Sequence, residues 1–293
     1  MRKVLLIFLC LILSHSLVYG QGCDSNTQFL NHFDCTDGDS DALDENCDSS
    51  GAHTITWNAT SQCDSGNTKF DNTLLLDGNS DYLSVPDSSD WDMFASNSDN
   101  WNVGFWVKHA SDPSATTQLY IGQIEDTDNY WYVIHQSGVI SYRFRENASP
   151  SLGLEGNDGI SDTNWHWIST AKVGNTHGLY LDGTQIAYGA ANETDTFSAP
   201  LRVGAFIVED IGLYVNGNME EVRIQKDNDI GASPVVGLTD TLTVPTEAYS
   251  VASSRNRMIN ITKFIKNIDG NGYRRHRWQE NAKGERISEI VID

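Results

Sequence analysis

The chain of 293 residues is poor in basic residues, in cysteine and in long apolar runs. It contains 19 Lys and Arg against 40 Asp and Glu, which gives a formal net charge of −21. Residues 21–250 hold 35 of the acidic residues and 8 of the basic ones. A surface this acidic argues against nucleic acid and anionic membranes as partners of that region. It suits calcium, neutral sugars or simple solubility.

A single apolar run, Val4 to Leu13, stands near the N-terminus. It is about half the length that a membrane-spanning helix requires. Arg2 and Lys3 precede it, and the small residues Val18 and Gly20 follow, which is the pattern of a secretory signal peptide over residues 1–20. No later stretch is apolar enough to cross a bilayer. We therefore expect a secreted protein, extracellular, periplasmic or held at a cell surface, with no transmembrane segment in its mature chain.

Four of the five cysteines, Cys23, Cys35, Cys47 and Cys63, remain after removal of this peptide. An even number in an exported chain predicts two disulfides near the start of the fold. Three pairings are possible, and we favour Cys35–Cys47 with Cys23–Cys63 because the first closes a short acidic loop. The long spacings without a C-x₂-C pair argue against zinc.

The pattern between residues 70 and 225 is that of short β-strands. Runs rich in Val, Ile, Tyr, Phe and Trp alternate with clusters of Gly, Asn, Asp and Ser. The predicted strands include 101–108, 130–134, 139–145, 165–172 and 178–181, with turns at Asp77-Gly78, Ser137-Gly138 and Asp182-Gly183. No amphipathic helical stretch precedes residue 250. The sequence therefore predicts an all-β sandwich or jelly roll.

Several blocks carry a family resemblance, in the order that the family has them. Residues 70–86 contain a strand with three consecutive leucines, an Asp-Gly turn and Asp-Tyr-Leu-Ser-Val-Pro. Residues 101–108 contain Phe-Trp-Val-Lys. Asn164-Trp-His-Trp-Ile-Ser, Leu179-Tyr-Leu-Asp-Gly and Gly217-Asn-Met-Glu-Glu-Val-Arg-Ile follow. Together these resemble the LamG-like domains of the concanavalin A-like lectin/glucanase superfamily. The resemblance implies a two-sheet antiparallel jelly-roll sandwich over residues 21–250, which binds carbohydrate or protein or accompanies an enzyme.

Glycoside hydrolases with this fold need two carboxylates about 5 Å apart for retaining chemistry. The nearest acidic pair is Glu125 and Asp126, and neighbours on a regular strand point to opposite faces. The sequence also has no G-x-S-x-G and no H-E-x-x-H. We therefore expect no enzyme activity, and a divergent glycoside hydrolase is a secondary alternative.

Calcium is the cofactor that the sequence favours. Residues 37–48 begin like an EF-hand loop, but Ala42 replaces its glycine and Asp48 its final Glu, so we interpret them as a flexible acidic loop. The family resemblance instead implies one structural calcium, with Asp34, Asp77 and Glu220 as the oxygen donors. Turn formation is the alternative role of Asp77, and solvation at a strand edge is that of Glu220.

Five aromatic residues are candidates for a ligand face: Trp106, Tyr130, Tyr132, Tyr142 and Trp167. If strand alternation holds, they lie opposite the side chains that face the core. Aromatic rings on a sheet stack on sugars and anchor protein interfaces. Sandwiches also bury many aromatics, and burial is the alternative for at least half of this set.

Residues 251–293 differ from the rest, with 9 basic and 5 acidic residues. One side of a short helix would be formed by Met258, Ile261, Phe264 or Ile265, and Ile268. Alternatively, Asp269-Gly270 would turn a hairpin into Tyr273 to Trp278. The arginine cluster suits docking on the acidic domain, on a phosphate-rich surface or on another subunit. We treat this segment as a basic C-terminal extension.

These observations predict a secreted, non-catalytic binding or adhesion module, with carbohydrate as the first ligand class. The alternative is a structural or assembly component of a virion or cell surface that binds protein. In either case the partner is an extracellular glycan or protein.

Overall fold

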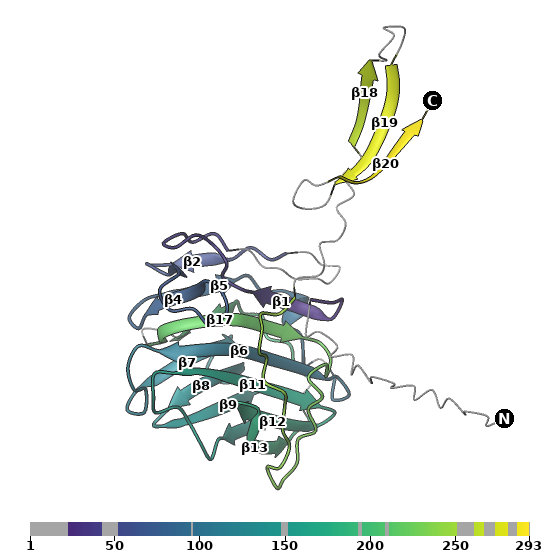
Figure 1. Cartoon of the computed structure of the whole chain (residues 1–293). Coiled ribbons are helices and arrows are strands. Elements are labelled where there is room, and N and C mark those ends of the chain that lie inside the picture. Colours follow the sequence, from purple (N-terminus) through teal and green to yellow (C-terminus); the bar gives the residue numbers. More distant parts are fainter. Residues whose placement is uncertain are drawn as a thin grey trace, which may run out of the picture.

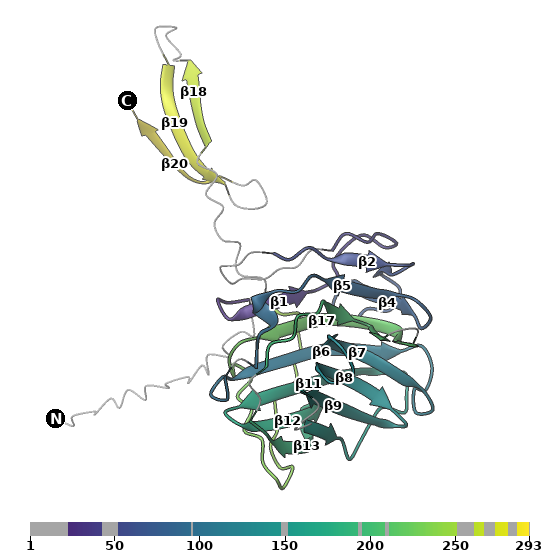
Figure 2. The same ribbon diagram turned by 180° about the vertical axis from the view of Figure 1, so that it is seen from behind.

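The computed structural model describes residues 23–42, 52–94, 96–147, 152–192, 195–208 and 211–250, together with the backbone of 261–266, 273–280 and 286–292. Its main body is two antiparallel sheets packed face to face (Figures 1 and 2). The predicted signal peptide lies outside the described residues. Among those described, no helix is long and apolar enough to cross a membrane.

The first sheet has eight strands and lies in front in Figure 1. In spatial order they are β13 (Thr184–Ala190), β12 (Thr176–Leu181), β11 (Trp165–Val173), β6 (Trp101–His109), β17 (Asn216–Gln225), β4 (Thr73–Asp77) and β3 (Gln62–Asp64), with β1 (Thr27–Asn31) also paired to β17. Strand β17 pairs with β4 over residues 216–219 and with β1 over residues 222–225, and a bulge between Glu220 and Arg223 interrupts its pairing with β6.

The second sheet has seven strands and comes forward in Figure 2. Their order is β10 (Leu152–Glu155), β9 (Val139–Arg145), β8 (Tyr130–Gln136), β7 (Thr117–Ile124), β14 (Leu201–Val203), β5 (Tyr82–Val85) and β2 (Thr56–Asn58). A short 3-10 turn, η1 (Ser89–Trp91), and a hairpin, β15 (Ala205–Val208) with β16 (Ile211–Tyr214), complete the body.

The core fills the space between the sheets, as strand alternation predicts. On β6, the side chains of Trp101, Val103, Phe105 and Val107 all belong to it and are fully buried. Wherever a strand alternates in this way, its other side chains lie on the outer face of the sheet. This leaves two outer faces, one on each sheet.

The predicted turns are confirmed. At Ser137-Gly138 and Asp182-Gly183 both residues have positive φ, which is the geometry that joins two strands by a two-residue hairpin. Gly78, in the third turn, also has positive φ. The prediction of a two-sheet antiparallel sandwich is therefore confirmed, and predicted strand 139–145 has the bounds of β9.

Residues 226–250 leave β17 and run across the outer face of the eight-stranded sheet (Figure 1). Near the end of this crossing segment, Glu221 accepts a hydrogen bond from the backbone N–H of Tyr249 at 2.6 Å. The N–H of Cys23 then donates to the carbonyl of Ser250 at 2.8 Å. The two ends of the sandwich therefore lie side by side.

The extension contains strands β18 (Ile261–Lys266), β19 (Tyr273–Glu280) and β20 (Arg286–Ile292). They form a separate three-stranded antiparallel sheet, and among the described strands they pair only with one another. Of the two sequence-based alternatives, the hairpin into Tyr273 is confirmed and the helix is wrong.

The favoured disulfide pairing is wrong. Cys35 is bonded to Cys63, with their Cα atoms 5.8 Å apart. The two residues come together because β3 pairs with β4 and returns the chain to the end of β1, so the fold closes the longer loop. Cys23 is also disulfide-bonded, and Cys47 lies outside the described residues.

Candidate functional site

The five predicted ligand-face aromatics are divided among three environments. Tyr142 faces inward from β9 and is fully buried, stacked against His177 with the ring centroids 6.1 Å apart. Its assignment to an outer face was wrong, because the parity of β9 points Ile140, Tyr142 and Phe144 into the core. Tyr142 is therefore a packing residue.

Trp106 and Trp167 do point outward, from the eight-stranded sheet, but the crossing segment covers them. Their cluster also contains Ala232 and Leu242 from that segment. Trp106 is 4% exposed and Trp167 is fully buried. Strand alternation predicts the face correctly here, yet it does not reveal that another part of the chain packs over it.

Tyr130 and Tyr132 are the two predicted aromatics that remain on an accessible face. They are alternate residues of β8 on the outer face of the seven-stranded sheet, and both are partly exposed. Their rings stack with centroids 5.0 Å apart and planes inclined by 25°. Burial, with a smaller effect of Tyr130, raises the pKa of Tyr132 to about 12, so its hydroxyl stays protonated at neutral pH.

Arginines and a glycine adjoin this tyrosine pair in the sheet register. Tyr130 lies opposite Arg145 and Tyr132 opposite Arg143, both on β9. On the other side, Tyr132 lies opposite Gly122 of β7, and Gly122 lies opposite Arg202 of β14. Directly opposed side chains stand about 5 Å apart. The result is a continuous row across four strands, which we call the tyrosine–arginine face.

The β15–β16 hairpin borders this face. Arg202 donates from Nη1 to the carbonyl of Ile207 in the hairpin at 2.7 Å. Leu213 of β16 packs with Tyr130 and Tyr132 against a small apolar cluster of Leu119, Ile124 and Ile134. The hairpin thus stands beside the strands of this face and contacts the rings of Tyr130 and Tyr132 from one side.

Sequence reasoning missed the arginines and glycines of this face. The sequence could have indicated that Arg143 and Arg145 lie on the outer face, because they alternate along the strand with the core residues Tyr142 and Phe144. The pairing of β9 with Tyr130 and Tyr132 depends on the strand order. A single sequence does not supply it.

Glu125 and Asp126, the acidic pair considered for catalysis, lie outside the strands. Both follow the end of β7 and lie in the turn to β8, not on a strand as we expected. Asp126 accepts hydrogen bonds from the backbone of Asp128 at 2.7 Å and the side chain of Asn129 at 3.0 Å. These bonds lower the pKa of Asp126, which gives it a turn-forming role.

The three predicted calcium donors have separate environments. Asp77 accepts from the backbone N–H groups of Asn79 and Ser80 at 2.8 and 3.1 Å, so it stabilises its own turn. Glu220 accepts from three backbone N–H groups, those of residues 69 to 71, at 2.8–3.0 Å. Burial raises the pKa of Glu220 to about 7 although those donors lower it.

These donors do not fit one calcium site. Asp77 pairs with Asn216, four residues away from Glu220 along β17. Within the described part of the chain, no three His, Cys, Asp or Glu side chains are grouped as metal ligands would be. Calcium binding stays a prediction without a site.

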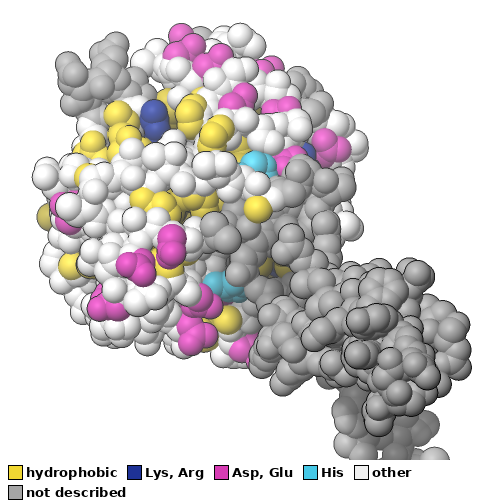
Figure 3. Space-filling model, turned by 90° about the horizontal axis from the view of Figure 1, so that it is seen from above, with side chains coloured by type: hydrophobic (Ala, Val, Ile, Leu, Met, Phe, Trp, Pro, Cys, Tyr) yellow, Lys and Arg dark blue, Asp and Glu magenta, His cyan; other side chains and the backbone are white. Residues whose placement is uncertain are grey.

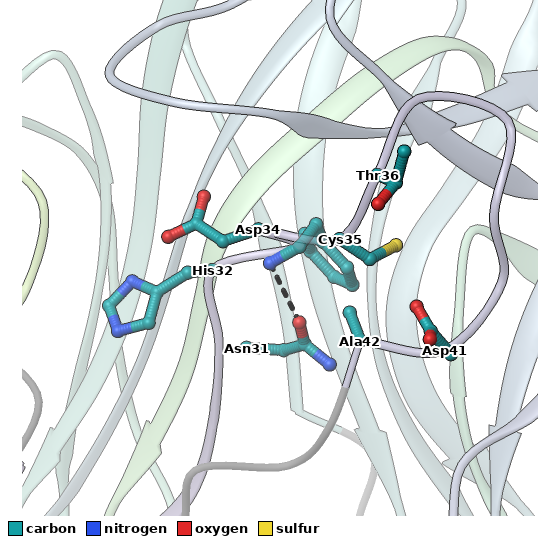
Figure 4. Close-up of a pocket in the computed structure, with 8 residues that line it drawn as sticks. Asn31, His32, Asp34, Cys35, Thr36, Asp41 and Ala42 are labelled. Atoms are coloured by element: carbon teal, nitrogen blue, oxygen red, sulfur yellow. Dashed lines mark hydrogen bonds between the residues drawn. The ribbon is translucent and has the colours of Figure 1, made fainter. Parts of the chain in front are cut away.

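Asp34, the third of these residues, lines a hollow of about 370 Å³ beyond β1 (Figure 4). In the figure its carboxylate and that of Asp41 lie on opposite sides of the hollow. The backbone N–H of Phe33 donates to Asn31 at 2.8 Å and shapes the turn between them. Two separated carboxylates do not make a calcium cage, which needs six to eight oxygens.

A larger hollow of about 560 Å³ lies on the eight-stranded sheet and is lined by residues of β3, β4, β6 and β17. Its lining includes the amides of Gln62, Asn67, Asn216 and Asn218. Lys108 donates to Asn67 at 3.0 Å, and Asn218 donates to Asp64 at 2.9 Å. The amides of Asn67 and Asn218 are thus engaged within the sheet edge, so the tyrosine–arginine face is the stronger candidate.

Comparison with known proteins supports the fold. No curated protein matches the chain by sequence. Among solved structures, domain 4 of AbnA, a GH43 extracellular arabinanase from Geobacillus stearothermophilus, determined with arabinotriose, is 19% identical with a TM-score of 0.51. The match covers 74% of this chain and 94% of that domain.

Toxin binding domains are similar to a comparable degree. The binding domain of Paraclostridial Mosquitocidal Protein 1 is 14% identical with a TM-score of 0.51, over 70% of this chain and 50% of that one. The binding domain of botulinum neurotoxin DC in complex with SialylT is 11% identical with a TM-score of 0.50, over 70% and 49%. The chain thus spans about half the length of these toxin domains.

At these identities the structural matches establish the fold alone. The sequence match is more specific, because residues 77–228 match the profile of the concanavalin A-like lectin/glucanases superfamily. This match covers more than half of the chain and includes strands of both sheets, from β5 to β17. The chain therefore belongs to the concanavalin A-like lectin/glucanase superfamily.

Proposed function

We propose that the sandwich is an extracellular, non-catalytic module that binds carbohydrate on its tyrosine–arginine face. The observation that carries this proposal is the stacked pair Tyr130 and Tyr132, partly exposed and held on a rigid strand. A rigid aromatic pair offers a large contact area at little entropic cost, because the rings are ordered before the ligand arrives.

The shape of the face supports a chain-like ligand. The row of side chains crosses strands β9, β8, β7 and β14 and is bordered on one side by the hairpin. A shelf of this kind accommodates several consecutive sugar units. A small molecule would instead need an enclosed pocket that covers most of its surface.

Further observations support export and binding. The N-terminal sequence has the pattern of a secretory signal, and the disulfide between Cys35 and Cys63 suits an oxidising compartment. Two of the structural neighbours are named with bound ligands, arabinotriose and SialylT. Asp126 stabilises its own turn and Glu125 accepts a hydrogen bond from the backbone N–H of Ser198 at 3.4 Å, and these structural contacts favour binding over hydrolysis.

The test is binding of the mature protein to a panel of polysaccharides that includes arabinan, β-glucan, galactan and pectate, measured by affinity electrophoresis and calorimetry. Replacing both tyrosines, Tyr130→Ala and Tyr132→Ala, should weaken binding about tenfold or more, as loss of a central aromatic anchor does. The control is Tyr188→Ala, which removes a partly exposed tyrosine from β13 of the other sheet. It should bind like the wild type.

Three outcomes would contradict the proposal. Glycan binding that the tyrosine pair does not affect would move the site elsewhere. Release of reducing ends by the wild type would indicate a hydrolase. Failure to bind any glycan, with tight binding to a purified protein of the same cell surface or virion, would favour the assembly role.

A further inference from the structure

The arginines of the sandwich are unevenly distributed. Residues 21–250 contain four arginines in a stretch with 35 acidic residues and 8 basic residues in all. Arg223 is 1% exposed and pairs with Asp229 at 2.6 Å. The other three, Arg143, Arg145 and Arg202, all lie on the tyrosine–arginine face. On the face seen in Figure 3, the charged side chains in view are mainly Asp and Glu.

Glycines shape the floor beneath two of these groups. A Cβ added at Gly153, which lies opposite Arg143, would come within 2.7 Å of its Nη1 atom. One added at Gly122 would come within 2.5 Å of the Cβ atom of Tyr132. The guanidinium and the tyrosine therefore lie close to the backbone of the neighbouring strands.

The arginines keep donor capacity for a ligand. Arg143 contacts Glu155 at 3.7 Å, and Arg145 contacts Asp128 at 3.1 Å. The side chains of Arg143, Glu155 and Asp128 are exposed by a third or more, and that of Arg145 is 32% exposed. Exposed ion pairs of this kind contribute little and exchange readily. A guanidinium has five N–H donors, so an incoming carboxylate or sulfate can bind alongside the acidic neighbour or displace it.

Screening decides whether a polyanion can approach so acidic a protein. At physiological ionic strength, charges farther away than about 8 Å are largely screened. Arg143 and Arg145 lie two residues apart on β9, and Arg202 lies three strands away on β14, about 14 Å across the sheet. An oxyanion that approaches one of these guanidinium groups therefore interacts with that group and its paired carboxylate, and the distant carboxylates are screened. Arginine also recognises planar oxyanions through two parallel hydrogen bonds, which lysine does not do.

We propose that the glycan which this face binds is an acidic polysaccharide, whose sugar rings stack on Tyr130 and Tyr132 while its carboxylate or sulfate groups pair with Arg143, Arg145 and Arg202. This inference rests on the proposed carbohydrate-binding function and specifies the ligand class at the same site.

Two matched polymer pairs test it: pectate against methyl-esterified pectin, and dextran sulfate against dextran. We expect about tenfold tighter binding of the charged member of at least one pair, and that preference should disappear near about 0.5 M salt. The pair that shows the preference tells whether carboxylate or sulfate is recognised.

The variant Arg143→Gln with Arg145→Gln should lose the preference for the charged polymer and keep the residual binding of the uncharged one. The control, Lys108→Gln with Lys226→Gln, removes two positive charges from outside this face and should change binding by less than about twofold. Circular dichroism checks that each variant is folded.

The outcomes separate this inference from the proposal on which it rests. Equal binding of charged and uncharged polymers, abolished by Tyr130→Ala with Tyr132→Ala, would overturn the acidic ligand and leave carbohydrate binding in place. A preference lost equally in the lysine control would also overturn it, because it would then be a nonspecific charge effect. Absence of binding to every glycan would overturn both.

Discussion

Gly122 lies in the middle of the tyrosine–arginine face, between Tyr132 and Arg202. An added methyl group there would come within 2.4 Å of the carbonyl oxygen of Trp131 and 2.5 Å of the Cβ of Tyr132. Those two atoms belong to the adjacent strand and cannot both move away cheaply. The absence of a side chain at this position is what lets β7 and β8 pair beneath the tyrosine ring.

We therefore expect Gly122→Ala to lower the free energy of unfolding by about 1–3 kcal/mol and to weaken ligand binding together with it. Urea denaturation measures the first effect and affinity electrophoresis the second. Gly237→Ala is the control, because there the added carbon meets only Thr239 at 3.9 Å and the backbone has no positive φ. Equal stability of the two variants would mean that the sheet accommodates the methyl group.

At the scale of elements, Glu220 connects two segments that are far apart in sequence. From β17 its two carboxylate oxygens accept hydrogen bonds from the N–H groups of Lys69, Phe70 and Asp71, just before β4. The side chain is fully buried. The family resemblance suggested a calcium ligand here. In the structure, the Glu220 carboxylate holds the loop of residues 69–71 by hydrogen bonds.

The substitution Glu220→Ala should lower the free energy of unfolding by about 1–3 kcal/mol, because the backbone N–H groups of residues 69–71 lose their acceptor. Hydrogen exchange should then accelerate at the amides of residues 69 to 71. Glu155→Ala removes an exposed carboxylate and should change stability by less than about 1 kcal/mol. Unchanged exchange at the three amides would show that the loop is held by other contacts.

The elements were the part of the structure most open to prediction from sequence. Alternation on β6 and the Asp-Gly turns follow local rules, so strands and turns were found close to their true bounds. What covers each face does not follow local rules. Trp106 and Tyr132 both point outward, but Phe70 and residues 226–250 pack around the first, whereas the second stays partly exposed. The Cys35–Cys63 bond depends in the same way on strand order.

At the scale of the whole molecule, the buried histidines make stability depend on pH. Burial lowers the pKa of His109 to about 4 and that of His177 to about 3, and it also lowers the pKa of His135. A histidine with a depressed folded pKa stabilises the fold above its unfolded value of 6.5. That stability is lost as pH falls from 6.5 through the folded pKa. Acid should therefore destabilise the sandwich.

His109 allows this effect to be isolated, because its Nε2 lies 2.9 Å from the hydroxyl of Tyr120 and glutamine can replace that contact. His109→Gln should reduce the stability loss between pH 7 and pH 4 by about 3 kcal/mol, measured by urea denaturation at both values.

His166→Gln is the control, because the pKa of His166 is shifted upward whereas that of His109 is shifted downward. Hydrogen bonds, first to Asp182 and then to Asp162, raise the pKa of His166 against the effect of burial. Its stabilising effect is present below pH 6.5 and is lost as pH rises through the folded pKa, so its replacement should cost most at low pH. The same pH profile in both variants and the wild type would contradict the assignment.

The hydrogen bond between Cys23 and Ser250 has a consequence for how the sandwich can be connected to other proteins. A folded unit whose first and last residues are adjacent can be inserted into a loop of a host protein without forcing that loop apart. It can also be circularly permuted, with the old ends joined by a short linker and new ones opened at a surface turn such as Ser137-Gly138. Evolution or an engineer could therefore place this sandwich within a larger chain as readily as at its end.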